Sequence, residues 1–125
     1  MAQSDAFEKY PQHRLEIDEA RVALRVTLNG VVLAETRRGL NLLEGDYPAV
    51  VYIPREDVAM DRLERSALST HCPFKGDASY FDWKGESETS PQVAWSYETP
   101  FDQMIAIREH LAFYPDRVEI ETIGD

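Results

Sequence analysis

Residues 22–35 read VALRVTLNGVVLAE, two apolar runs separated by Asn29-Gly30. In the first run, apolar side chains at every second position alternate with shorter or polar ones such as Arg25 and Thr27. This period of two is typical of a strand with one buried face. Asn-Gly favours a type I′ turn, because both central residues of that turn need a positive φ. The stretch therefore predicts a β-hairpin.

Strand signals continue along the rest of the chain. Short β-branched or aromatic runs are bounded by glycine, proline or polar residues, and we expect strands at 40–43, 49–53, 63–70, 78–83, 92–97 and 117–121. Residues 1–18 are polar and lack a clear period, so we expect an N-terminal arm followed by a single β-rich domain at 19–125. The predicted fold is mainly β: a compact antiparallel β domain, barrel-like or of stacked sheets.

One helix is predicted in the C-terminal half, from Pro100 to Phe113. Thr99 suits an N-cap, and proline fits the first helical position. Apolar residues then recur at helical spacing, and Pro115 limits the helix at its end.

Composition narrows the classes of function. The chain has 125 residues, a net charge of −10 and one cysteine. Nucleic-acid affinity comes largely from Lys and Arg that neutralise phosphates, so no nucleic-acid partner is expected. No apolar run approaches the about 20 residues that a spanning helix needs, and the first ten residues do not resemble a signal peptide. We expect no membrane partner and a cytoplasmic location, with the oligomeric state left open.

The densest group of chemically capable side chains is Thr70-His71-Cys72-Pro73-Phe74-Lys75-Gly76, on a predicted turn. A cysteine reacts as the thiolate, which a nearby positive charge such as Lys75 stabilises. Cys72 and His71 are therefore the candidate catalytic residues, and Lys75 is a candidate for binding an anionic group. The alternative is a small apolar cysteine packed under the turn, since free cysteine is among the most buried residue types.

Aromatic and charged residues elsewhere add to the candidate site. Phe81, Trp83 and Trp95 are expected in the core, whereas Tyr80 and Tyr97 are candidate pocket residues because each carries a polar tip. Arg55 and Asp57 follow a predicted buried strand and are further candidate ligand-binding residues, with a solvated surface pair as the alternative.

No metal site or cofactor is expected. The histidines and the cysteine show no zinc spacing, and the chain has neither a phosphate-binding glycine motif nor a Gly-x-Ser-x-Gly elbow.

Four segments together resemble a known family; they are 51–58 (VYIPREDV), 70–80 (THCPFKGDASY), 94–97 (AWSY) and 112–114 (AFY). They are similar to the bacterial and fungal family catalogued as domain of unknown function 427. The resemblance runs from about Arg21 to Ile120 and implies a small β-rich domain with a site near the His-Cys-Pro-Phe-Lys-Gly turn. The family has also been labelled as nucleotidyltransferases, but the Gly-Ser element typical of those enzymes does not occur in this chain.

Two functions remain open at this point. The first is a small-molecule-binding domain, with an anionic ligand and a pocket near the turn, and with weak enzymatic chemistry at Cys72. The second is a non-catalytic protein-interaction module that offers an open strand edge or an exposed apolar patch. An accessible Cys72 beside Lys75 and Tyr80 in one pocket would favour the first.

Overall fold

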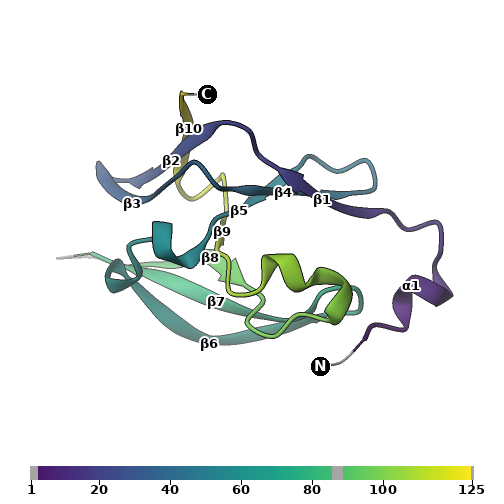
Figure 1. Ribbon diagram of the computed structural model, residues 1–125. Coiled ribbons are helices and arrows are strands. Elements are labelled where there is room, and N and C mark those ends of the chain that lie inside the picture. The colour runs from purple at the N-terminus through teal and green to yellow at the C-terminus, as the bar shows by residue number, and fades with distance from the viewer. Residues whose placement is uncertain (1–2, 86–88, 125) are drawn as a thin grey trace.

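The computed structural model describes residues 3–85 and 89–124, which are mainly β-strand (Figure 1). The strands are β1 (Leu15–Glu19), β2 (Ala23–Leu28), β3 (Val31–Thr36), β4 (Leu40–Glu44), β5 (Val50–Tyr52), β6 (Leu63–Cys72), β7 (Gly76–Lys84), β8 (Thr89–Ser96), β9 (Ala112–Phe113) and β10 (Glu119–Gly124). The helical elements are α1 (Ala6–Lys9) and the short 3-10 helices η1 (Arg55–Asp57), η2 (Met60–Arg62) and η3 (Asp102–Ile107). The predicted fold class is confirmed.

The strands of the described residues form three antiparallel sheets, ordered β1-β4-β5, β10-β2-β3 and β6-β7-β8-β9. Figure 1 shows β1 to β4 along one side of the molecule and β6 and β7 along the other. The two sides meet where Ile53, just after β5, exchanges two backbone hydrogen bonds of 2.8 Å with Leu111, just before β9. Of the two arrangements expected from the sequence, these open sheets fit stacked sheets.

The hairpin at 22–35 is confirmed as β2 and β3, with Leu28 opposite Val31. Asn29 and Gly30 have φ angles of 51° and 79°, the positive values that the turn requires. One face of this hairpin packs toward the four-stranded sheet. The Asn-Gly turn therefore positions the apolar residues of both hairpin strands for the core.

Two hydrophobic clusters lie on opposite faces of the four-stranded sheet. The first joins β2 and β3 to Phe81 and Trp83 of β7, and the second joins β4, β5 and η3 to Ala78 of the same strand. Phe81 and Trp83 are buried, as predicted. Trp95 was expected in the core but is only half-buried against the second cluster, whereas Tyr97, expected in a pocket, is buried within it.

The C-terminal helix exists but is much shorter than predicted. Instead of an α-helix from Pro100 to Phe113, η3 covers only 102–107, and its backbone is non-helical at Met104. Glu109 adopts a positive φ of 62°, and residues 112–113 form a strand paired with β8. The apolar spacing marked Met104, Ile107 and Leu111, which are buried, but also Ile105, which is exposed. Backbone pairing with distant strands replaced the second half of the helix.

The N-terminal segment contacts the rest of the chain through a strand and through η3. The expected boundary at residue 18 falls inside β1, which pairs with β4 from Leu15 opposite Glu44 onward. Ser4 and Ala6 are buried. Gln103 on η3 exchanges two hydrogen bonds of 3.1 Å with the backbone of Ser4. Residues 4–19 therefore take part in both a helix contact and a sheet.

Candidate functional site

The His-Cys-Pro-Phe-Lys-Gly turn connects β6 to β7 and packs on the start of η3. Cys72 lies opposite Gly76 in the strand register, and the Phe101 amide donates to the Lys75 carbonyl over 3.1 Å. Gly76 has a φ of 112°, which side chains rarely tolerate, and a Cβ there would lie 3.4 Å from the Pro100 backbone. Glycine thus allows the turn to sit directly against the residues that lead into η3.

Phe74, at the tip of this turn, is the centre of an aromatic cluster from the N-terminal segment. The imidazole of His13 stacks on its ring, with centroids 4.0 Å apart and planes 16° apart. Phe7 meets the same ring edge-on at 5.2 Å, and Tyr10 lies at 6.3 Å. The Ser4 hydroxyl also donates to the Pro73 carbonyl. The turn is therefore the surface on which residues 4–13 dock.

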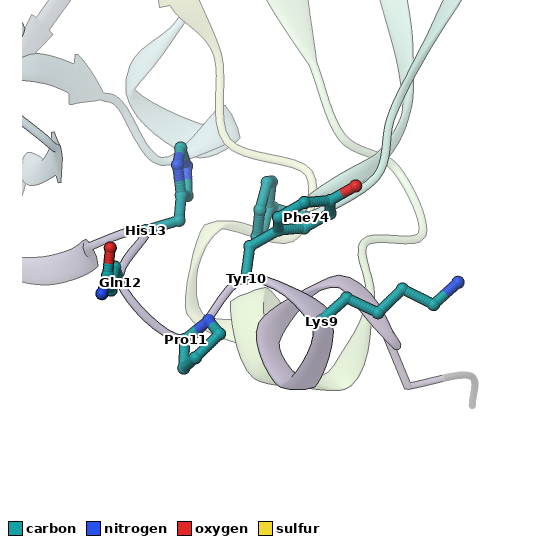
Figure 2. A pocket seen from close by; sticks show the side chains of 6 residues that line it. All are labelled: Lys9, Tyr10, Pro11, Gln12, His13 and Phe74. Carbon is teal, nitrogen blue, oxygen red and sulfur yellow. The ribbon is translucent and has the colours of Figure 1, made fainter.

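A hollow of about 660 Å³ opens beside this cluster. It is lined by Lys9, Tyr10, Pro11, Gln12, His13 and Phe74 (Figure 2). Figure 2 shows residues 9–13 curving around the space, with the Lys9 side chain extending away from Gln12 and His13. Four of the six lining side chains carry rings, and four carry a polar group.

Behind the hollow, Glu44 links the N-terminal segment to the turn. His13 Nε2 donates to one carboxylate oxygen over 2.9 Å, and Lys75 Nζ donates to the other over 3.1 Å. Burial by itself would raise the pKa of Glu44, but the charge and hydrogen bond of Lys75, with those of His13, outweigh it and lower the pKa below its ordinary value. The carboxylate therefore remains ionised and holds both partners.

Lys75 is committed to this ion pair. Its side chain is only 13% exposed, and its ammonium group also lies 5.7 Å from the centre of the Tyr97 ring. An anionic ligand would have to displace Glu44 to reach the Lys75 ammonium group.

The structure does not bring Cys72 and His71 together. Cys72 is a half-buried free cysteine whose side chain packs against the second hydrophobic cluster. His71 is exposed, and its Nδ1 lies 2.7 Å from an oxygen of Asp77. Residues that adjoin on a strand point to opposite faces, so His71 is not placed as a base for the thiol.

Tyr80 and Tyr97 lie with Tyr52 and Trp95 on the face of the four-stranded sheet that carries the second hydrophobic cluster. The Tyr80 hydroxyl hydrogen-bonds to Thr70 over 2.8 Å, and burial raises the pKa of Tyr97 well above its ordinary value. The same effect raises the pKa of Tyr52, whose hydroxyl accepts a 3.1 Å hydrogen bond from Trp95 Nε1. The hydroxyls of Tyr80 and Tyr52 are thus hydrogen-bonded on this packed face.

Arg55 and Asp57 lie apart from the turn. Arg55 pairs with Glu98 over 2.7 Å and donates to the Glu109 carbonyl over 3.0 Å. Asp57 pairs with Arg38 over 2.9 Å, and its pKa is lowered because the hydrogen bonds of Arg38 and Thr36 outweigh the effect of burial. Both residues hold loops onto strands.

Sequence reasoning did not single out residues 9–13 as the lining of a hollow, although the histidines were weighed as metal ligands. Tyr10 and His13 contact Phe74 from some sixty positions away, and the local pattern contains no information about such a contact. The aromatic pair formed by Phe7 and Tyr10 in an otherwise polar segment was the one available signal.

Two negative findings apply to residues 3–85 and 89–124. Their His, Cys, Asp and Glu side chains form no group of three that is suited to holding a metal ion. Their helices include none with the length and apolar character needed to cross a membrane.

Comparison with known proteins identifies a family for this chain. A family model described as "Domain of unknown function (DUF427)" matches residues 16–124. The search of curated proteins found no match.

Proposed function

We propose that this protein, which belongs to the family described as domain of unknown function 427, binds a small molecule in the hollow beside Phe74. The description of the family names no activity. The ligand is a planar aromatic molecule with an anionic group. Its ring contacts the rings of Phe74, Tyr10 and His13, and its charge lies near Lys9.

The single cysteine, free in the described chain, supports a reducing compartment, and we place the protein in the cytoplasm.

The observation that carries the proposal is the fixed wall that Phe74 makes with His13. The stacked rings hold one another, and Glu44 fixes the far side of the imidazole. Side chains that are already held in place lose less conformational entropy when a ligand binds than side chains that the ligand must order. Aromatic rings also pair with one another in offset or edge-on geometries, which favours an aromatic ligand here.

Lys9 is the source of the expected charge preference. It is exposed at the end of α1 and lines the hollow. Lys75, the residue that the sequence suggested for this role, is paired with Glu44. The proposed anion site is therefore displaced from the turn to the N-terminal segment that docks on it.

Binding, not catalysis, is the function that this geometry supports best. Cys72 is not among the residues that line the hollow, and His71 is directed to Asp77. Catalysis at Cys72 stays a hypothesis that requires a base other than His71, and cysteine labelling tests it separately.

The proposal is tested by titrating 1-naphthoate against the purified chain and following binding by calorimetry. Lys9→Gln removes the charge, and Tyr10→Ala removes an exposed ring that lies 6.3 Å from the ring of Phe74. Tyr47→Ala is the matched control, because Tyr47 is also exposed and lies outside the hollow. We expect saturable binding that each of the first two variants weakens and the control leaves unchanged. Absence of saturable binding, or equal binding by all three variants, contradicts the proposal.

A protein-interaction module is the second candidate, and the free edge of β6 favours it. This strand runs for ten residues at the edge of its sheet, pairs with β7 in the described sheet order, and exposes most of its side chains. An open edge of this length offers backbone groups to an added strand. Sedimentation at rising concentration tests pairing with a second copy, and Leu68→Lys should abolish any association that uses this edge.

A further inference from the structure

A second hollow opens beside Trp95, and the residues that line it all carry apolar side chains. It encloses about 300 Å³ where strands of all three sheets meet. It is lined by Leu24, Val26, Ala49, Val50, Val51, Ile53, Trp95, Phe113, Pro115 and Ile120. Among these described residues none carries a charge.

We propose that this hollow is a binding site for a neutral apolar molecule of about ten carbon atoms, such as a fused two-ring hydrocarbon. It is distinct from the site beside Phe74, with which it shares no lining residue.

The hollow has the depth of a ligand site. Its floor consists of the buried side chains of Leu24, Val26, Ile53 and Phe113. Its rim consists of exposed Ala49, Pro115 and Ile120. Protein interiors pack to the density of organic crystals, so an unfilled apolar space beside four core residues departs from ordinary packing. An exposed rim gives a ligand a route to that space.

The one polar side-chain atom among the lining residues is the indole nitrogen of Trp95, and it already has a hydrogen-bond partner. Trp95 Nε1, the polar atom of the largest lining side chain, donates to the Tyr52 hydroxyl over 3.1 Å. The Tyr114 ring lies 4.4 Å from the Trp95 ring and supports it. Trp95 therefore presents carbon atoms to the space, and a charged or strongly polar ligand would lose its hydration without gaining a partner. This chemistry selects a neutral hydrocarbon-like molecule.

The volume sets the size of the ligand. An apolar cavity of about 150 Å³ remains dry and accommodates one benzene ring. The observed 300 Å³ thus suits about two fused rings.

The test is a titration of the full chain with naphthalene, followed by the NMR shifts of methyl groups. We expect saturable shifts confined to lining residues such as Val26, Ile53 and Ile120. Val26→Phe should fill the hollow and abolish binding. Val93→Phe is the matched control: both valines are fully buried, but Val93 does not line the hollow. Val93→Phe should therefore lower the melting temperature and keep the binding.

A rim variant keeps the proposal testable if either phenylalanine variant fails to fold. Ile120 and Ile105 are 42% and 41% exposed, and only the first lines the hollow. Ile120→Glu should weaken naphthalene binding about tenfold, because it places a charge at the apolar mouth, and Ile105→Glu should not. 1-Naphthoate, which is charged, should bind here at least about tenfold more weakly than naphthalene. The proposal is overturned by unsaturable shifts in the parent, by full binding in folded Val26→Phe, or by equal binding in the two glutamate variants.

Discussion

The imidazole of His13 stacks on the ring of Phe74 at a centroid distance of 4.0 Å, and this contact joins the N-terminal segment to the β6–β7 turn. Glu44 holds the same imidazole through Nε2. Three segments that are distant in sequence are thereby joined through His13. The turn that the sequence marked as reactive serves, in the structure, as a docking surface.

Phe74→Ala should detach the N-terminal segment. The variant loses ring contacts with His13 and Phe7 at a half-buried position, so we expect the free energy of unfolding to fall by about 1–3 kcal/mol. Cleavage within residues 3–14 by a non-specific protease should become much faster. Tyr47→Ala is the control and should change neither quantity. A Phe74→Ala protein as resistant as the parent would show that the docking of the segment does not depend on this ring.

Glu44→Gln should destabilise the protein at neutral pH and have no effect in acid. The folded-state pKa of Glu44 lies below its ordinary value, so the ionised carboxylate stabilises the fold at higher pH, and this contribution is lost as the pH falls from about 4.5 through the folded-state pKa. We expect a loss of about 1–2 kcal/mol at pH 7.

Denaturant unfolding at a series of pH values measures this difference. Glu16→Gln on β1 is the control, because its ion pair with Arg14 is largely exposed and should contribute little. A deficit of Glu44→Gln that stays constant down to pH 2 would show that the loss does not arise from the charge.

Tyr52→Phe and Tyr97→Phe should differ, although both remove one hydroxyl from the second cluster. The Tyr52 hydroxyl accepts from Trp95 Nε1, so its removal should cost about 1 kcal/mol of unfolding free energy. No hydrogen bond of the Tyr97 hydroxyl is found within the described part of the chain, and its removal should be close to neutral. Thermal unfolding of the two proteins in parallel decides this, and equal losses would contradict the assigned hydrogen bond.

Cys72 should react with iodoacetamide in the native protein no faster than a free cysteine. Its side chain is half-buried, and the charge of Lys75 is compensated by Glu44 at 3.1 Å. Lys75→Met should therefore change the labelling rate by no more than about twofold. If native Cys72 reacts faster than a free thiol and Lys75→Met slows it severalfold, the cysteine is an activated nucleophile and catalysis becomes the better hypothesis.

The features predicted correctly from the sequence are those encoded over a few residues. Asn29-Gly30 fixes the hairpin by its own φ requirements, and alternation within 78–83 places Phe81 and Trp83 in the core. The predicted helix from Pro100 failed beyond residue 107 because Leu111 bonds the backbone of Ile53, a partner that the local spacing does not reveal.

The candidate site shows the same limit. The turn at 72–76 was found because its residues adjoin, but its partners His13 and Glu44 come from segments with no distinguishing pattern. Charge pairing is equally hidden in the sequence: Lys75, Arg55 and Asp57 each carry an ion pair that only the folded chain reveals.

The most direct test of ligand binding beside Phe74 is a chemical-shift map of the ¹⁵N-labelled chain with 1-naphthoate. We expect saturable shifts at the backbone amides of residues 9, 10, 12, 13 and 74, together with the ring protons of Phe74, and small shifts elsewhere. Shifts that concentrate around Val26 and Trp95, or an absence of saturable shifts at residues 9–13, would contradict the central proposal.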